Sequence, residues 1–200
     1  MTMKTNNSRN IRPRPFLKWV GGKTQLLPEL RERVGGAEPF GQYHEPFVGG
    51  GALFFDLHRA KRLGRAKAQL SDNNDRLIEA YKGVREDVET LIVKLKVHKA
   101  LHNKEYYYQV RANVPEDALS RAARIIYLNK TCFNGLFREN SKGLFNVPIG
   151  RYVNPEICDE PNLRAVAKAL RKAEVEQRPF EAILDNAKSG DFVYFDPPYH

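Results

Sequence analysis

The chain has 200 residues, 42% of them hydrophobic and 10% aromatic, which is enough for one domain with a sizeable core and excludes wholesale disorder. Its 33 Lys and Arg outnumber 24 Asp and Glu, so the net charge is +9 and the pI is near 9.6, which favours a nucleic-acid partner. Two cysteines exclude a disulfide framework and fit a reducing cytoplasm, and no apolar run approaches the roughly 18 residues of a membrane-spanning helix.

The N-terminal part of the chain is polar and basic. Residues 1–15 lack the apolar segment of a signal peptide, and their prolines oppose helix formation, so we expect a flexible tail. The following stretch FLKWVGGKT, residues 16–24, ends like a phosphate-binding loop. Leu17, however, stands where that loop needs its first glycine, which argues against a nucleotide triphosphate site. Residues 24–34 then predict a helix that a glycine pair ends.

A strand and a glycine-rich loop follow. Residues 42–47 predict a short strand, three glycines come next, and residues 52–63 predict a helix with an inward apolar side. Residues 66–72 predict a second strand, which ends at Asp72 in the turn sequence DNND. This succession of strand, glycine loop, helix, strand and acid predicts the beginning of a doubly wound α/β sheet.

The middle of the chain has a helical pattern. Apolar residues recur at helical spacing through residues 76–129, and a helix is predicted to start at Pro115 with two acids in its first turn. Residues 131–152 differ in composition, since asparagine, glycine and aromatic residues are interspersed there with basic ones. The sequence NSKG inside this segment is a turn signal, so its flanks predict a hairpin.

The α/β alternation resumes in the last quarter of the chain. The pattern predicts a helix at residues 161–173, a strand at 174–177, a helix at 180–187 and a buried strand at 191–200. A parallel sheet that begins this way normally needs more strands, so we expect the chain to be incomplete at its C-terminus.

The string DFVYFDPPY carries the most chemical information. In open α/β sheets ligands bind beyond the carboxyl ends of the strands, where Asp196 to Tyr199 would lie. The Asp196 carboxylate and the Pro197 carbonyl can each accept a hydrogen bond from one N–H of an exocyclic amino group on a planar base, which localises the nitrogen lone pair for attack. Tyr199 offers a flat face for an extruded base. A strand that merely ends in prolines requires neither the acid nor the aromatic residue.

Four motifs in a fixed order carry a family resemblance. FLKWVGGK, EPFVGGGALFF, LSDNND and DPPY resemble the Dam-type (D12 class) DNA adenine-N6 methyltransferases over residues 16–199. Related NPPY and SPPY motifs serve other amino groups, whereas a leading aspartate favours adenine. The resemblance implies a Rossmann-like doubly wound sheet of the S-adenosylmethionine-dependent methyltransferase type with a helical and hairpin DNA-recognition insert. The implied catalytic domain comprises residues 16–75 and 160–200, and the insert with the target-recognition region comprises residues 76–159.

The resemblance also implies a cofactor site for S-adenosylmethionine. Lys23 would neutralise the methionine carboxylate, Trp19 would lie near the sulfonium, and Asp72 would bind the ribose hydroxyls. A dinucleotide-binding loop is the competing interpretation, but Phe54 stands where its third glycine is needed. The implied cofactor-binding residues are Trp19, Lys23, Glu45, Pro46, Phe47, Gly49, Gly51, Asp72 and Asp196, and the implied catalytic residues are Asp196, Pro197 and Tyr199.

No metal is required for this chemistry. His98 and His102 lie four apart on a predicted helix and could form half of a zinc site, but the sequence offers no third ligand nearby.

Residues 129–151 resemble the target-recognition region of the same family. Arginines can bind guanine or clamp phosphate, an aromatic side chain such as Phe133 can wedge into the base stack, and Phe145 is expected to face inward. The pattern NGL-R-N--G-FNVP-GRY predicts GATC as the target, while the departure at residues 130–133 leaves another short adenine-containing site open. The implied DNA-binding residues are Lys18, Lys130, Phe133, Asn134, Arg138 and Arg151.

The function that follows is methyl transfer from S-adenosylmethionine to the N6 amino group of adenine in duplex DNA. We expect double-stranded DNA as a partner, no membrane, and a monomer that is bacterial or phage-encoded, cytoplasmic and nucleoid-associated. The role stays open between a restriction-associated enzyme, which would have a cognate restriction endonuclease as a further partner, and a housekeeping or phage enzyme. Two alternatives stay open: an inactive DNA-binding fragment, and a methyltransferase for RNA or protein amino groups. Cofactor binding and the identity of the methylated substrate discriminate between them.

Overall fold

The computed structural model describes residues 11–19, 21, 24–34 and 40–197, and the strands and helices below are those of this part of the chain. The strands are β1 (Gln42–Glu45), β2 (Lys67–Asp72), β3 (Ala173–Gln177) and β4 (Phe192–Val193). The helices are η1 (Thr24–Leu26), α1 (Leu27–Val34), α2 (Ala52–Arg59), α3 (Asp75–Glu86), α4 (Val88–Leu101), α5 (Lys104–Ala112), α6 (Ala118–Thr131), η2 (Phe133–Gly135), α7 (Glu160–Leu170), η3 (Phe180–Ala182) and α8 (Ile183–Asn186).

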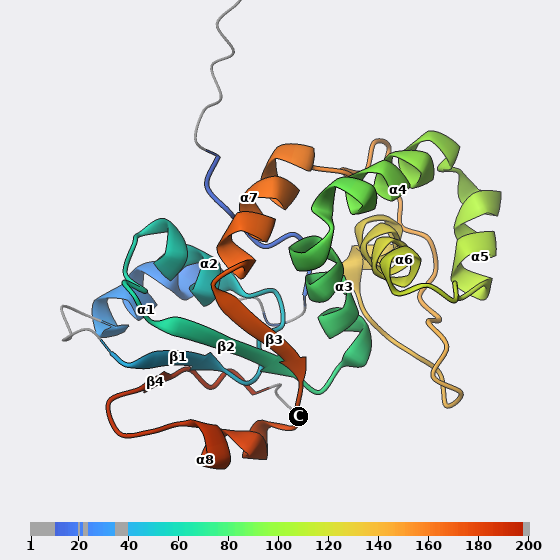
Figure 1. The fold of residues 1–200 in the computed structure, drawn as a ribbon. Coiled ribbons are helices and arrows are strands. Elements are labelled where there is room, and N and C mark those ends of the chain that lie inside the picture. Colours follow the sequence, from blue (N-terminus) through green and yellow to red (C-terminus); the bar gives the residue numbers. More distant parts are fainter. Residues whose placement is uncertain (1–10, 20, 22–23, 35–39, 198–200) are drawn as a thin grey trace, which may run out of the picture.

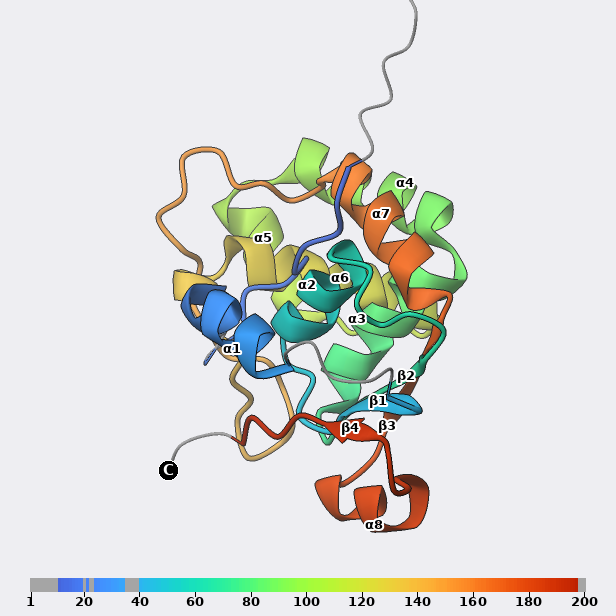
Figure 2. The same ribbon diagram turned by 90° about the vertical axis from the view of Figure 1, so that its left-hand side faces the viewer.

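The strands form a parallel sheet in the order β3-β2-β1-β4. Tyr43 on β1 is paired with Ala68 on β2 and with Phe192 on β4. The helices α1, α2, α3 and α7 lie over one face of the sheet, and α8 lies against the other face (Figures 1 and 2). The predicted doubly wound α/β class is therefore confirmed, and the chain changes winding direction between β1 and β4, where such sheets bind ligands.

The last strand is much shorter than the sequence pattern suggests. The sequence pattern predicts a buried strand at residues 191–200. Within the described part of that range, residues 191–197, only Phe192 and Val193 form β4, and Phe195 is 48% exposed. Tyr194 still donates its N–H to the carbonyl of His44 at 2.9 Å, and the ladder then ends. Proline has no N–H with which to continue a ladder, so the chain turns away before the Asp196–Pro197 pair.

The four helices α3 to α6 follow β2, and each begins at a capping residue. The side chains of Asn74, Asp87, Asn103 and Asp117 each accept a hydrogen bond from the first turn of the helix that follows. The helix that was predicted to start at Pro115 starts instead at Ala118, and Asp117 caps it. Since α6 is buried along most of its length between the other three helices, it is the centre of this layer (Figure 1).

The apolar core is continuous from the sheet into the helical layer. Tyr43 packs between Phe54 on α2 and Phe192 on β4, with ring centroids 6.3 and 5.9 Å apart respectively. On α3, Tyr81 contacts Phe16 edge-on at 5.0 Å, so the N-terminal segment is part of the same core. The described part of the predicted flexible tail, residues 11–15, is held by Arg14, whose guanidinium lies 3.8 Å from Glu156.

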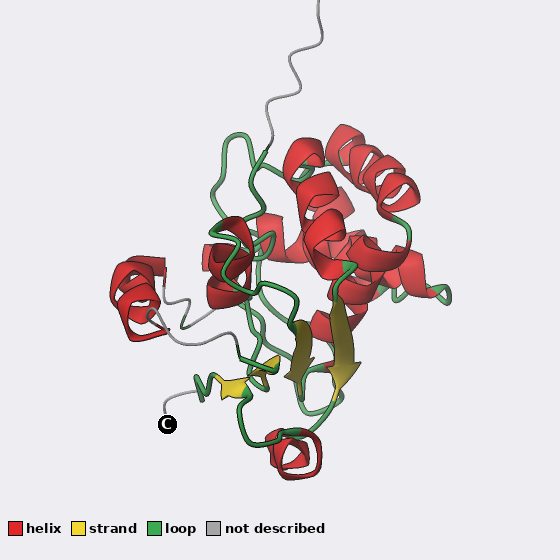
Figure 3. Cartoon of the chain, turned by 60° about the vertical axis from the view of Figure 1, so that its left-hand side comes forward, coloured by secondary structure: helices red, strands yellow, loops and turns green. Residues whose placement is uncertain are grey.

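The segment predicted as a hairpin is antiparallel but irregular. Its first residue, Thr131, still belongs to α6, and η2 follows. Isolated bridges join Cys132 to Ile149 and Glu139 to Phe145 in place of a strand ladder. Phe145 is 6% exposed, which confirms that it faces inward. After η2 the segment has the green of loops and turns in Figure 3, and we call residues 132–152 the recognition loop after the role that the sequence predicts for them.

One further local prediction changes in the structure, and the two histidines of the helical layer find partners. The helix expected at residues 180–187 is a 3-10 turn followed by the short α8. His98 and His102 hydrogen-bond the hydroxyls of Tyr106 and Tyr127, at 2.8 and 2.9 Å, so both face aromatic partners in the helical layer. Among the described helices, none has the length and apolar character that crossing a membrane requires.

Candidate functional site

A cleft of about 1010 Å³ opens at the carboxyl edge of the sheet. The segments that follow β1, β2, β3 and β4 line it, together with the N-terminal segment that enters the domain. The predicted residues that it brings together are Lys18, Trp19, Glu45, Pro46, Phe47, Gly49, Gly51, Asp72, Asn134, Asp196 and Pro197. The two other predicted site residues of this region, Lys23 and Tyr199, lie outside the described residues.

The glycine loop between β1 and α2 forms the floor of the cleft. The N–H of Gly49 donates to the Asp72 carboxylate at 3.1 Å, and the Tyr81 hydroxyl donates to the carbonyl of Gly49 at 3.1 Å. Gly51 has φ +66°, and a Cβ at this position would lie 2.6 Å from the Tyr81 hydroxyl oxygen. A side chain is therefore excluded both by backbone conformation and by space, and the loop exposes backbone to the cleft.

Asp72 stands at the carboxyl end of β2 and shapes the same loop. One carboxylate oxygen accepts from the N–H of Gly49, and the other accepts from the N–H of Asn74 at 3.0 Å. Burial raises the pKa of Asp72, although these backbone hydrogen bonds oppose the shift. Because each carboxylate oxygen has two lone pairs, Asp72 keeps acceptor capacity for a ligand in the cleft.

Glu45 ends β1 and is 3% exposed. The Tyr43 hydroxyl donates to one of its oxygens at 2.7 Å. Burial, opposed by this hydrogen bond and assisted by the charge of Asp196, raises the pKa of Glu45 to about 8. Near neutral pH Glu45 is therefore mostly protonated and can donate a hydrogen bond as well as accept one.

The pair Asp196–Pro197 lies at the cleft because β4 is paired with β1. The Asp191 carboxylate accepts from the N–H of Gln42 at 2.8 Å and lies 3.1 Å from the His44 ring nitrogen Nε2. These contacts fix the start of β4 beside β1, so the residues that follow β4 lie across from the end of β1. Asp196 consequently shares the cleft with Glu45.

One side of an aromatic surface on the β3 side of the cleft, the ring of Phe180, was not among the predicted site residues, whereas its partner Phe47 was. Phe180 on η3 stacks against Phe47 with ring centroids 5.4 Å apart, and both rings line the cleft. Pro179, Glu181 and Tyr194 line it as well. The position of residues 179–181 just beyond a predicted parallel strand was the signal that could have identified them, since ligands bind at that edge.

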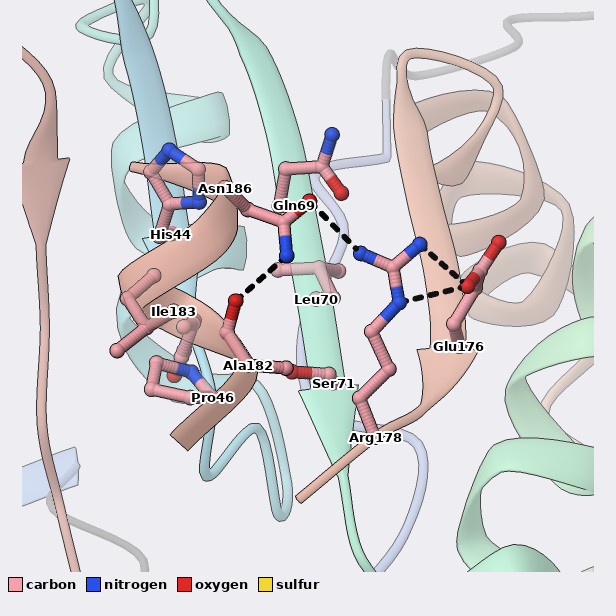
Figure 4. A pocket seen from close by; sticks show the side chains of 11 residues that line it. His44, Pro46, Gln69, Leu70, Ser71, Glu176, Arg178, Ala182, Ile183 and Asn186 are labelled. Atoms are coloured by element: carbon pink, nitrogen blue, oxygen red, sulfur yellow. Dashed lines mark hydrogen bonds and ion pairs between the residues drawn. The ribbon is translucent and has the colours of Figure 1, made fainter. Parts of the chain in front are cut away.

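A small hollow beneath the sheet shows how η3 and α8 are held in place (Figure 4). Arg178 pairs with Glu176 at 2.7 Å and bonds the side chain of Asn186 at 3.4 Å. Asn186 in turn donates to the carbonyl of Ala182 at 2.6 Å. The hollow has a volume of about 20 Å³, which is room for about one water molecule and too little for a larger ligand. The hydrogen bonds around it hold the segment that carries Phe180 in place.

The N-terminal segment supplies the opposite wall of the cleft. The indole of Trp19 approaches Gly49 so closely that a Cβ there would lie 2.9 Å from its Cδ1 atom. Trp19 also stacks on Phe137 of the recognition loop, with ring centroids 5.4 Å apart. The Nζ atom of Lys18 lies 4.0 Å from the centroid of the Tyr152 ring. This wall therefore touches the glycine loop on one side and the recognition loop on the other.

The predicted DNA-binding residues differ in their exposure. Phe133 is 47% exposed, and Asn134 lines the cleft with φ +53°. Arg138 and Arg151 are exposed, and Arg138 donates to the side chain of Asn146 at 2.7 Å. Lys130 is half-buried near the end of α6, where burial lowers its pKa. The structure thus places Lys18 and Asn134 at the cleft, and the other four residues at the end of α6 or on the recognition loop beside it.

Comparisons with known proteins agree on one family. Residues 19–200 match the family model described as D12 class N6 adenine-specific DNA methyltransferase. The chain is 41% identical over 207 residues to "Type II methyltransferase M1.LlaDCHI" of Lactococcus lactis subsp. cremoris, with 100% of this chain and 69% of the relative covered. It is 43% identical over 201 residues to "Type II methyltransferase M.MjaIII" of Methanocaldococcus jannaschii, covering 93% and 69%. It is 34% identical over 191 residues to "DNA adenine methylase" of Serratia marcescens, covering 93% and 67%.

Proposed function

The chain belongs to the D12 class of N6 adenine-specific DNA methyltransferases, and we propose that it transfers the methyl group of S-adenosylmethionine to adenine N6 within GATC sites of duplex DNA. One observation carries the proposal. A single cleft contains both the glycine loop with Asp72 and the pair Asp196–Pro197, although these residues are more than a hundred positions apart in the sequence. This arrangement would place a methyl donor beside an acceptor amino group, which is what methyl transfer requires.

The residues of the cleft fit S-adenosylmethionine. A volume of about 1010 Å³ accommodates a ligand of this size. The backbone around Gly49 and Gly51 is open to close approach, Asp72 accepts from ribose hydroxyls, and the rings of Phe47 and Phe180 offer a flat apolar surface. Bound there, S-adenosylmethionine would supply the activated methyl group on its sulfonium. We further propose that Trp19, Lys23, Glu45 and Pro46 complete this site.

The pair Asp196–Pro197 would activate the acceptor. One N–H of the adenine amino group would donate a hydrogen bond to the Asp196 carboxylate, and the other would donate to the Pro197 carbonyl. Both bonds strengthen as the nitrogen becomes tetrahedral, so they stabilise the transition state more than the ground state. Tyr199, whose placement lies outside the described residues, would stack on the extruded base.

The recognition loop and the cleft rim would read the DNA. Arg138 and Arg151 are exposed and suit phosphate or guanine contacts, and the exposed ring of Phe133 suits insertion into the base stack. Lys18, Lys130 and Asn134 would contribute further contacts. The domain division that follows places catalysis in residues 16–75 and 160–200, and target recognition in residues 76–159.

Transfer of a labelled methyl group tests the function and the role of Asp196 together. The parent chain is expected to label a duplex that contains GATC and to leave a duplex with the permuted site GTAC unlabelled. Asp196→Asn is expected to lower the rate at least about a hundredfold, because the amide cannot replace a charged acceptor in the transition state. Asp185→Asn, on the exposed side of α8, serves as the matched control and should keep the parent rate.

Each competing function predicts a different result in the same assay. Labelling of RNA or of protein, with none of DNA, would identify the RNA or protein methyltransferase. DNA binding without binding of S-adenosylmethionine in calorimetry would identify an inactive DNA-binding fragment. Labelling that persists in Asp196→Asn would refute the proposed role of this residue.

We also propose a restriction-modification context with the enzyme acting as a monomer. The names of two of the relatives identify them as type II methyltransferases. Protection of methylated DNA from an endonuclease that cuts the same site tests the pairing, and sedimentation of the chain with duplex DNA tests the monomer.

A further inference from the structure

Two buried asparagines hold the N-terminal segment, residues 11–19, in the same way. Asn162 on α7 accepts from the N–H of Arg14 at 3.0 Å and donates to its carbonyl at 3.2 Å. Asn129 on α6 accepts from the N–H of Lys18 at 2.8 Å and donates to its carbonyl at 2.7 Å. The exposed fractions of the two asparagines are 3% and 2%, so each amide is a buried polar group satisfied by one backbone residue of the segment.

Within the part of the chain that the structure describes, Asn129 makes one contact that has no counterpart at Asn162. Its amide also donates to the carbonyl of Gly135 in the recognition loop, at 3.0 Å. Gly135 in turn packs so tightly on Lys18 that a Cβ at Gly135 would lie 2.6 Å from the Lys18 Cβ. One side chain thus joins the N-terminal segment and the recognition loop through hydrogen bonds to both backbones.

The residue next to Lys18 extends this connection to the cleft. Trp19 lies against Gly49 of the glycine loop and stacks on Phe137 of the recognition loop. If DNA binding displaces the recognition loop, Lys18 and Trp19 would therefore move with it and shift the wall of the cleft. Packed side chains and backbone hydrogen bonds of this kind transmit coupling between neighbouring sites.

We propose that Asn129 is a positioning residue that couples DNA binding at the recognition loop to S-adenosylmethionine binding in the cleft. The inference rests on the proposed function, since it takes both ligands from there. Coupling between two sites is reciprocal, so each ligand should tighten the binding of the other by the same factor. Removal of the Asn129 amide should abolish this factor, and removal of the Asn162 amide should not.

The experiment measures S-adenosylmethionine affinity by calorimetry, with and without a saturating duplex that contains one GATC site. In the parent chain we expect the duplex to tighten binding about tenfold, within the usual range for coupled sites. Asn129→Leu should reduce this ratio to within about twofold of one. Asn162→Leu is the matched control, because it removes an equally buried amide with two hydrogen bonds to the backbone of the same segment. This variant should keep the parent ratio while losing comparable thermal stability.

Each outcome decides the inference. Equal loss of coupling in the two variants, or full coupling in Asn129→Leu, overturns it, because the effect would then be structural or absent. If Asn129→Leu does not fold, Phe137→Leu takes its place. Phe137 is only partly buried, and its loss removes the stacking on Trp19 that continues the same connection, so the affinity ratio should again fall to within about twofold of one. A parent chain that binds both ligands without coupling overturns this inference alone, whereas a parent chain that binds neither overturns the proposed function with it.

Discussion

The substitution Glu45→Gln tests the protonation state of the cleft directly. Glu45 is buried at the end of β1, and its pKa in the folded chain is raised to about 8 from an ordinary value of 4.5. The folded chain therefore retains a proton between these two pH values that the unfolded chain has released. By linkage, the contribution of Glu45 to stability is greatest below about pH 4.5 and is lost as the pH rises to about 8.

The size of this loss follows from the shift. One pKa unit corresponds to about 1.4 kcal/mol, so ionisation of Glu45 costs the folded state about 5 kcal/mol when complete. Glutamine has nearly the same shape, can still accept from the Tyr43 hydroxyl and does not ionise. The free energy of unfolding of Glu45→Gln minus that of the parent should therefore increase by about 1.4 kcal/mol per pH unit between about pH 5 and pH 7.5.

Urea unfolding followed by circular dichroism, without DNA or cofactor, measures this difference at each pH. Glu181→Gln is the matched control, because its carboxylate lines the same cleft but is exposed, and its profile should run parallel to that of the parent. Parallel profiles for Glu45→Gln and the parent would show that Glu45 is already ionised in the folded chain. That result would refute the assignment of a neutral Glu45 to the cleft.

Three further predictions concern the glycine loop, the helical layer and the recognition loop. Gly51→Ala should lower the free energy of unfolding by about 2 kcal/mol because its Cβ would meet the Tyr81 hydroxyl; Gly64→Ala, with no atom near its Cβ, should cost less in the same urea titration. Burial lowers the pKa of His98 to about 4, so stability present above about pH 6.5 is lost as the pH falls to about 4; His98→Gln should flatten this acid limb in thermal melts. Arg138→Ala should reduce the slope of DNA affinity against salt concentration by about one if Arg138 contacts phosphate, and an unchanged slope would exclude that contact.

The order of motifs along the chain was sufficient to predict the family and the class of fold. Hydrophobic periodicity and glycine positions are local properties, so the strands that became β1, β2 and β3 and the glycine loop before α2 were predicted within a few residues. The functional groups of Asp72, Asp196 and Pro197 are likewise local, because the chemistry that each can perform depends on residue type. The structure confirms the parallel sheet and places these three residues in one cleft.

Other features depend on contacts between distant parts of the chain and could not be predicted from the sequence pattern. The length of β4 depends on its pairing with β1, and the presence of Phe180 at the cleft depends on how η3 docks beneath the sheet. The raised pKa of Glu45 requires the burial that surrounding elements provide.

Asn129 shows the same division most clearly. Its position at the start of the resemblance to a target-recognition region was visible in the sequence, but its partners Lys18 and Gly135 lie 111 positions before it and 6 after it. A local pattern specifies which element forms and which chemical groups it carries. Burial, hydrogen-bond partners and coupling between sites arise only when those elements pack, because these properties belong to pairs of residues that the fold brings together.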